Sequence, residues 1–252
     1  MSIPCNRAFT LIELSIVLVI IGLVVGGIMT GKTLIQQAEI RAAASQLQKF
    51  ETAYRTFQVK YGCIMGDCAN ATDFFGTNYV VVASGCPPSG GAGNGNGNGD
   101  GFIDQSSGLT SNGTWRCEPI QALKSLSLSG FLPSDMSAPC QASLLVYFKG
   151  INDSCAFFYK NTLWNNYNLP LNAINWANIQ SGGFSPISGA LSPVQARLID
   201  EKLDDGNPTN GKFRVLDAAL LSGGGVVANS CVTSGIYNTN EDNTCRSLYY
   251  FK

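Results

Sequence analysis

The sequence contains no histidine among its 252 residues. Ser-His-Asp and Cys-His nucleophile arrangements and most catalytic zinc sites depend on an imidazole that titrates near neutral pH, so its absence argues against these enzyme classes. Charged residues are sparse, at 13% of the chain, and 16 Lys and Arg residues are matched by 17 Asp and Glu residues. Because there is no basic excess, we expect no nucleic acid among the partners.

The nine cysteines also lack the paired Cys-x-x-Cys spacing of a metal site. Cys5 lies near the N-terminus, which leaves an even set further along the chain: Cys63, Cys68, Cys86, Cys117, Cys140, Cys155, Cys231 and Cys245. An even set indicates disulfides, and therefore an exported protein in an oxidising compartment. Cys63 and Cys68 are close enough in sequence to form a small clamp, whose effect would be on local geometry.

One long apolar run, Phe9 to Met29, contains a single charge, Glu13. About 20 apolar residues are enough to cross the hydrocarbon core of a bilayer. A carboxylate near the end of such a span is costly, and it usually marks a functional contact. The run is preceded only by MSIPCNRA, which carries Arg7 and ends in Ala8. A cleavage site would therefore precede the apolar segment, whereas in a secretory signal it follows.

The segment AFTLIEL (residues 8–14) resembles the processing site of type IV prepilins and type II secretion pseudopilins. The resemblance implies that prepilin peptidase cuts between Ala8 and Phe9 and that the new amine of Phe9 is methylated. The family usually has Gly before the cut, where this chain has Ala8. The resemblance also implies that Glu13 offsets the N-terminal ammonium of a neighbouring subunit, because two opposite charges in an apolar filament core are tolerable only as a pair. The alternative is an ordinary membrane anchor with a stray Glu.

A helical pattern continues beyond the apolar run. Apolar residues recur at alternating spacings of four and three, on one helix face: Ala43, Leu47, Phe50, Tyr54, Phe57 and Tyr61. One helix from about Phe9 to Tyr61 would be roughly 80 Å long, more than any bilayer requires. We therefore expect four parts: a leader (1–8), a membrane or filament-core half-helix (9–29), a head-packing half-helix (30–61) and a globular head (62–252). This is the α+β pilin fold, in which the helix packs on an antiparallel β-sheet.

No proline interrupts the apolar half, although many type IV pilins carry one near its end. Gly22, Gly26 and Gly27 are the nearest candidates for local loosening during assembly, since Gly weakens a helix interior by up to about 1 kcal/mol. The alternative is that these glycines only allow close packing of neighbouring helices.

The stretch GGAGNGNGNGDG (residues 90–101) is the most biased in composition. One interpretation is a flexible surface loop. The other is a calcium loop, with oxygen ligands on alternate residues: Asn96, Asn98, Asp100, the carbonyl of Phe102, and Asp104. The Asn at the first position and Ser107 in place of a bidentate Glu both argue for weak affinity. Calcium is the one cofactor that the sequence suggests, and none is required.

Local patterns predict the elements of the head. An amphipathic helix is expected over Glu118–Ser129, and a second begins at Ser192, where Pro193 and Gln195 suit a capping box. The other expectations are strands at 143–148 and 155–159 forming a hairpin across 150–153, a strand at 213–216, and a loop-rich, disulfide-bounded terminus at 217–252. Segments 61–76 and 193–211 resemble a group of bacterial pilin-like proteins. The resemblance favours Cys231 with Cys245, a pair that closes a C-terminal loop.

Four acids near residue 200 invite a comparison with paired-carboxylate hydrolases: Asp200, Glu201, Asp204 and Asp205. We reject an enzyme because these acids fall at a helix end and turn with Lys202, where solvated charges are common. The sequence alone gives no support for a second calcium site at Asp204 or Asp205.

These features predict a structural subunit of a type IV pilus. Its partners would be copies of itself, prepilin peptidase, the assembly machinery and, before assembly, the bacterial inner membrane; the product would be a cell-surface filament. A periplasmic pseudopilus subunit of type II secretion is an alternative. Another is a minor adhesive pilin that binds through Asn161–Gly189, a segment expected to be a surface excursion. Trp164 and Trp176 would make the contact there, unless these aromatics pin the segment to the head.

Overall fold

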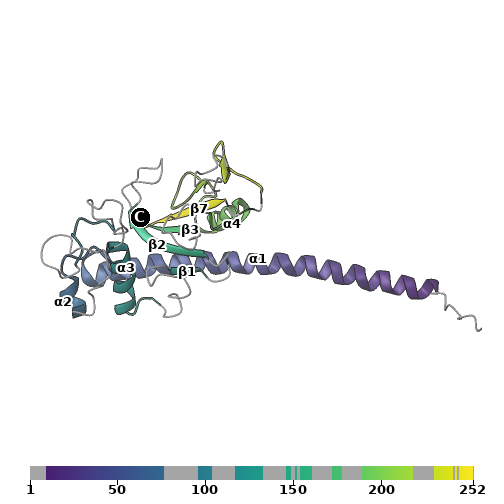
Figure 1. The fold of residues 1–252 in the computed structure, drawn as a ribbon, viewed down its shortest axis with the longest axis horizontal. Coiled ribbons are helices and arrows are strands. Elements are labelled where there is room, and N and C mark those ends of the chain that lie inside the picture. Colours follow the sequence, from purple (N-terminus) through teal and green to yellow (C-terminus); the bar gives the residue numbers. More distant parts are fainter. Residues whose placement is uncertain are drawn as a thin grey trace, which may run out of the picture. The chain divides into compact units, whose positions relative to one another are not determined.

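The computed structural model describes residues 10–76, 96–103, 117–132, 146–148, 151, 154–160, 172–177, 189–217, 230–240, 242 and 244–251. Four helices lie in these residues: α1 (Leu11–Tyr61), α2 (Ala71–Phe75), α3 (Cys117–Leu128) and α4 (Pro193–Leu203) (Figure 1). The strands are β1 (Val146–Phe148), β2 (Ser154–Lys160), β3 (Asn172–Ala177), β4 (Phe213–Asp217), β5 (Val232–Thr233), β6 (Ile236–Tyr237) and β7 (Cys245–Tyr250). The chain divides into two compact units, Met1–Glu39 and Ile40–Lys252.

In the first unit, the part of α1 that the structure describes is helical from Leu11 onward, without a break at Gly22, Gly26 or Gly27. Leucine and methionine, which are not branched at Cβ, favour the helix, and the many β-branched Ile and Val residues tolerate it when their surface is covered. None of the side chains from Leu11 to Thr30 is buried within the chain. The apolar side chains of this segment are therefore available to contact lipid or another protein molecule.

The second unit contains the remainder of α1, and here one face of the helix is buried. The buried positions are Ile40, Ala43, Ala44, Leu47, Phe50, Ala53, Tyr54 and Phe57. The predicted aromatic stripe is confirmed, with Tyr61 at its end only partly buried. Burial begins at Ile40, so residues 30–39 of the predicted head-packing half lie in the first compact unit.

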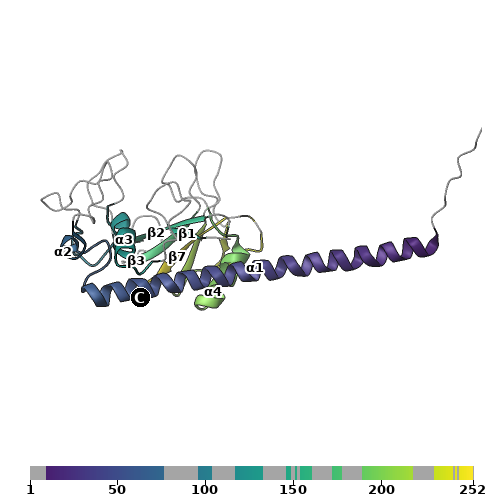
Figure 2. The ribbon, with the colours of Figure 1, turned by 90° about the horizontal axis from the view of Figure 1, so that it is seen from below.

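An antiparallel sheet of five strands, in the order β1-β2-β3-β7-β4, packs against this part of α1 (Figure 2). The predicted hairpin is present, because Val146 pairs with Ala156 and Phe148 with Ser154. Phe50 of α1 contacts Phe158 of β2, with ring centroids 5.7 Å apart. These aromatic contacts form the core of the head, and the α+β pilin fold expected from the sequence is observed.

Two strands of the five-stranded sheet lie where none was predicted, and the short pair β5 and β6 also lies in the terminus that was expected to be loop-rich. β3 falls inside the segment that was expected to be a surface excursion, and it pairs with both β2 and β7. β7 lies in the terminus that was expected to be loop-rich, and it is inserted between β3 and β4. All six residues of β7 are buried. A strand buried on both faces loses the alternation of polar and apolar residues by which a strand is recognised in sequence.

The two predicted helices of the head are confirmed as α3 and α4, within one residue of the expected boundaries of α3. At the start of α4, the Gln195 amide N–H donates to the Ser192 hydroxyl at 3.2 Å, and the Ser192 N–H donates to the Gln195 side chain at 3.0 Å. This is the capping box that the sequence suggested, and it satisfies two backbone donors at the helix start. The predicted strand at 213–216 is β4.

Candidate functional site

The apolar surface of α1 between Leu11 and Met29 is the largest unexplained feature of the chain. Fourteen large apolar side chains in this segment are exposed, by fractions that run from 47% at Val17 to 87% at Leu11. Removing a side chain of this kind from water is worth about 1.5–3 kcal/mol, so leaving all of them in water would cost on the order of 20 kcal/mol or more. Soluble monomers do not expose such a surface, which is covered by lipid or by other protein.

Within the part of the chain that the structure describes, α1 is the one helix long and apolar enough to cross a membrane. Its single acid in that stretch is Glu13, in the first turn of the helix. The apolar residues and the position of this acid together fit a membrane-anchored precursor.

Glu13 is held at the start of α1 by a reciprocal set of hydrogen bonds with Thr10. The Thr10 amide N–H donates to Oε2 of Glu13 at 2.8 Å, and the Thr10 hydroxyl donates to the same oxygen at 2.7 Å. In return, the Glu13 amide N–H lies 3.3 Å from the Thr10 hydroxyl oxygen. This is the geometry of a capping box, with Thr10 at the N-cap and Glu13 three residues later. Both bonds from Thr10 use Oε2, so Oε1 can accept a hydrogen bond from a cationic group.

The two predicted processing residues, Ala8 and Phe9, lie outside the described residues. The structure does place Glu13 in the first turn of α1. In a processed chain beginning at Phe9, it would be the fifth residue. A carboxylate here also interacts favourably with the positive end of the helix dipole. Its local role as a cap and its proposed role between subunits are separate, and they can be separated by mutation.

Glycines along the exposed segment leave open surface on the helix. An added Cβ at Gly22, Gly26 or Gly27 would have no heavy atom within 4 Å. Nothing in the chain therefore requires glycine at these three positions for steric reasons. The absence of side chains at these positions allows close approach by another helix. Both predictions for these glycines, local loosening during assembly and close packing of neighbouring helices, stay predictions.

In the head, Glu51 of α1 joins strands that lie far along the sequence. Its Oε1 accepts a hydrogen bond from Nζ of Lys212 at 2.9 Å, and the Tyr249 hydroxyl donates to Oε2. Arg55, one turn further along the helix, donates to Oε1 at 2.8 Å. Partial burial raises the pKa of Glu51, but the hydrogen bonds from Lys212, Tyr249 and Arg55 outweigh it and lower the pKa to about 2. The carboxylate is therefore ionised and anchors α1 to the sheet.

Glu51→Gln should lower the free energy of unfolding of the head by about 1–3 kcal/mol at pH 7. Because the folded-state pKa is about 2, against 4.5 without these contacts, ionisation of Glu51 stabilises the fold above pH 4.5. This contribution is lost as the pH falls towards 2, so the difference between variant and wild type should shrink over that range. Urea unfolding of the full-length chain in detergent, at several pH values, measures both quantities.

A matched control for this prediction is Asp73→Asn, which removes an exposed carboxylate in α2. It should change the free energy of unfolding by less than about 0.5 kcal/mol at neutral pH. An equal destabilisation by Glu51→Gln at neutral pH and near pH 2 would contradict the proposed electrostatic anchor.

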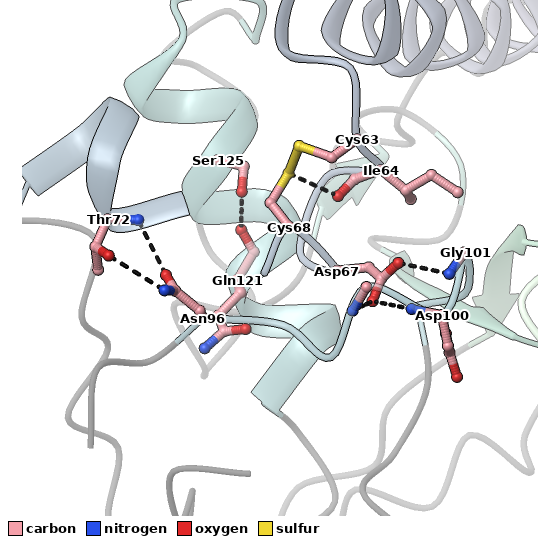
Figure 3. Close-up of a disulfide and its surroundings, with 11 residues drawn as sticks. Cys63, Ile64, Asp67, Cys68, Thr72, Asn96, Asp100, Gly101, Gln121 and Ser125 are labelled. Atoms are coloured by element: carbon pink, nitrogen blue, oxygen red, sulfur yellow. Dashed lines mark hydrogen bonds between the residues drawn. A yellow bond between two sulfur atoms is a disulfide. The ribbon is translucent and has the colours of Figure 1, made fainter. Parts of the chain in front are cut away.

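Residues 96–101 of the Gly- and Asn-rich stretch pack around a buried carboxylate, that of Asp67 (Figure 3). Asp67, which is 2% exposed, accepts backbone N–H bonds from Gly99 at 2.6 Å and from Gly101 at 2.7 Å, and a third from Asp100 at 3.2 Å. Burial raises the pKa of Asp67, and the Gly101 and Gly99 donors lower it in part. A Cβ on Gly97 would lie 2.3 Å from the Asp67 backbone, so only glycine fits there. This part of the loop is integral to the fold.

The predicted calcium ligands in this loop have other hydrogen-bond partners. Asn96 accepts the Thr72 N–H at 2.9 Å and donates to its hydroxyl, while Asn98 and Asp100 each accept a backbone N–H two residues ahead. Asp104 lies outside the described residues. The backbone donors of 99–101 converge on an anion, Asp67, and this arrangement suits a carboxylate better than a cation. Calcium binding by this loop stays a prediction.

Among the residues that the structure describes, Cys63 is bonded to Cys68 and Cys231 to Cys245. These are the two pairs that the sequence favoured. The first follows the end of α1 and lies beside the turn that carries Asp67 (Figure 3). The second joins β7 to the residue that precedes β5, and so ties the C-terminal hairpin to the sheet. Both constrain the head rather than the exposed helix.

Sequence reasoning missed Glu51 and Asp67 as anchors of the head. Glu51 lies off the aromatic stripe of α1, and its partners Lys212 and Tyr249 lie 161 and 198 residues away. The partners of Asp67 are backbone groups of a loop 32–34 residues further on. No local signal identifies such partners.

Comparison with known proteins supports the reading of the N-terminus. Residues 3–29 match a family model described as the prokaryotic N-terminal methylation motif. The match spans the leader, the predicted cleavage position, Glu13 and the exposed apolar surface of α1, and it confirms the resemblance drawn from residues 8–14. No curated protein and no solved structure matched the chain.

Proposed function

We propose that this chain, which carries the processing motif of type IV prepilins and pseudopilins, is a structural subunit of a type IV pilus. The observation that carries the proposal is the coincidence of that motif with an apolar helix surface whose side chains are exposed in the part of the chain that the structure describes. Proteins with this motif are structural, and they are processed by prepilin peptidase and handled by an assembly machinery. The helix would sit in the inner membrane before assembly and in the filament core afterwards.

Assembly would depend on two charged groups near the N-terminal end of α1, the new amine of Phe9 and the carboxylate of Glu13. Cleavage before Phe9 would create an ammonium group four residues ahead of Glu13. Burial of an unpaired ammonium in an apolar core costs several kcal/mol, and a carboxylate from a neighbouring subunit offsets that cost. Glu13 is the only acid in the motif, and one of its oxygens already caps the helix while the other is free to accept the neighbour's amine.

A pilus is favoured over a pseudopilus by the head. Its compact unit is large, at 213 residues, and this size favours a subunit exposed outside the cell. Its disulfides form equally in the oxidising periplasm and outside the cell, so they do not separate the two alternatives. The adhesive alternative loses one of its two contact residues, since Trp176 is 1% exposed. Trp164 lies outside the described residues.

The proposal is tested by peptide mass spectrometry on filaments sheared from cells that express the chain. An abundant peptide that begins at methylated Phe9 in the sheared fraction is the expected result. The same peptide confined to the membrane fraction would favour a pseudopilin. If every N-terminal peptide still began at Met1, Ala8 would have prevented cleavage, and the proposed function would be wrong.

A further inference from the structure

Three carboxylates converge where α4 ends. Asp200 lies in the last turn of the helix, and Asp204 and Asp205 follow its end. One oxygen from each of the three lies within 4.8 Å of the oxygens of the other two. Calcium holds its oxygen ligands at about 2.3–2.6 Å, so ligands of one ion can be up to roughly 5 Å apart. The three oxygens are therefore close enough to share a single ion.

A second observation concerns the buried member of the group. Asp200 is fully buried, at 0% exposure, and its Oδ2 accepts a hydrogen bond from the Tyr237 hydroxyl at 2.8 Å. Its Oδ1 has no hydrogen-bond partner among the residues that the structure describes. Buried polar atoms are almost always paired, so an orphaned carboxylate oxygen within an acidic group indicates a missing ligand.

The other two carboxylates are positioned by backbone donors. One oxygen of Asp204, Oδ2, accepts the N–H groups of Lys212 and Phe213. Oδ1 of Asp205 accepts the N–H of Asn207 at 2.9 Å. Asp204 and Asp205 are thus each held in place through one carboxylate oxygen. Fixed carboxylates of this kind lose little freedom when they bind an ion.

The charge around the group also favours a cation. The C-terminal end of a helix carries partial negative charge, where basic residues are normally preferred, and Lys202 is the basic residue in the last turn of α4. Here Arg197 pairs with Glu201 at 2.7 Å and Lys212 pairs with Glu51 at 2.9 Å. Neither of these two cations is paired with the three aspartates. The mutual repulsion of the three aspartates would be relieved by a divalent ion.

We propose that Asp200, Asp204 and Asp205 bind a hard divalent cation, calcium by preference, with water completing the coordination. An all-oxygen ligand set selects calcium or magnesium over transition metals, which favour nitrogen and sulfur. Three protein ligands suit the weak affinities of extracellular modules, with Kd on the order of 10⁻⁴–10⁻³ M. This site is separate from the predicted loop at 96–104, and it does not depend on which filament the chain builds.

Binding would stabilise the head through Asp204. The same side chain accepts the N–H of Lys212, and the Lys212 ammonium pairs with Glu51 on α1. An ion at the end of α4 would therefore fix the turn that leads into β4, and with it the contact between that turn and Ile40–Tyr61 of α1. The expected effect is on the unfolding of the head.

The test is thermal unfolding of the full-length chain in detergent, stripped with chelator and then titrated with calcium or magnesium. At about ten times Kd, the ion should raise the unfolding midpoint by roughly 3–5 °C for a domain of this size. Asp205→Asn, an exposed position, should abolish most of the shift, and the isosteric Asp200→Asn should do the same. Glu201→Gln, an exposed acid beside the site, is the matched control and should keep the shift.

Terbium luminescence excited through tyrosine gives a local readout, because Tyr237 contacts Asp200 directly. Wild type and Glu201→Gln should show sensitised emission that calcium displaces, and Asp205→Asn should show little. The proposal is overturned if wild type shows no shift at about 10 mM calcium. It is equally overturned if Asp205→Asn keeps the full shift, or if Asp100→Asn abolishes the shift and so assigns calcium to the loop at 96–104.

Discussion

Cells that express Glu13→Gln should assemble almost no filament, although the variant chain is made, processed and folded. The substitution leaves the neighbour's N-terminal ammonium without its counter-charge in an apolar core. Removing one partner of a buried ion pair costs about 3–5 kcal/mol, which corresponds to subunit addition weakened by roughly a hundredfold or more. Filament yield in the sheared fraction, relative to total cellular chain, measures the effect.

The structure supplies a matched pair of variants for this prediction. Gln can replace Glu in a capping box, so Glu13→Gln removes the charge and keeps the cap. Thr10→Ala removes the hydroxyl that bonds to Glu13 and keeps the charge, at a cost of about 1 kcal/mol in helix stability. We expect Thr10→Ala to assemble far better than Glu13→Gln. Similar yields from the two variants would mean that Glu13 acts only as a helix cap.

Processing must be followed in the same experiment. Mass spectrometry of the N-terminal peptide shows whether each variant is cleaved before Phe9 and methylated. Formation of the Cys63–Cys68 and Cys231–Cys245 disulfides shows that the head has folded. If processing and both disulfides are normal, a loss of filament in Glu13→Gln can be assigned to the assembly step.

Trp176→Ala should unfold the head or bring it close to unfolding. The indole is 1% exposed, stacks on Phe148 with ring centroids 4.1 Å apart, and donates from Nε1 to the Ser154 hydroxyl at 2.6 Å. Replacing a buried Trp with Ala costs about 3–5 kcal/mol, a large share of the 5–15 kcal/mol by which a domain is stable. Thermal unfolding of the full-length chain in detergent, followed by near-ultraviolet circular dichroism, measures the loss.

Trp176→Phe separates the two contributions of this side chain. The phenyl ring still fills most of the space occupied by the indole, but the N–H bond to Ser154 is lost. The free energy of unfolding should therefore fall by a smaller amount, about 1–2 kcal/mol. An adhesive role for Trp176 predicts a different result, in which Trp176→Ala folds and assembles normally and only loses binding. A wild-type unfolding midpoint for Trp176→Ala would refute its place in the core.

Features that arise from neighbouring residues could be read from the sequence. The capping box at Ser192 and Gln195, the hairpin that joins β1 to β2, and the aromatic stripe of α1 all depend on spacings of a few residues. Helix and turn geometry turns such spacings directly into contacts. The short disulfide between Cys63 and Cys68 belongs to the same group.

Features that depend on distant partners could not be read in this way. β3 and β7 are adjacent in the sheet although about 70 residues separate them, and β7 shows no alternation because both of its faces are buried. The partners of Glu51 and Asp67 and the grouping of Asp200 with Asp204 and Asp205 also required coordinates. Sequence showed acids at a helix end, but only the structure showed that one is buried with an oxygen left unpaired.

The sequence by itself determined the processing motif, the apolar helix and the acid within it, because each is a property of consecutive residues. It also determined that the head would be an α+β unit with disulfides. The tertiary structure decided that β7 lies between β3 and β4, how α1 is anchored through Glu51, and where three carboxylates converge. These outcomes depend on burial and on contacts between residues far apart in the chain, and such contacts form only when the whole head is folded.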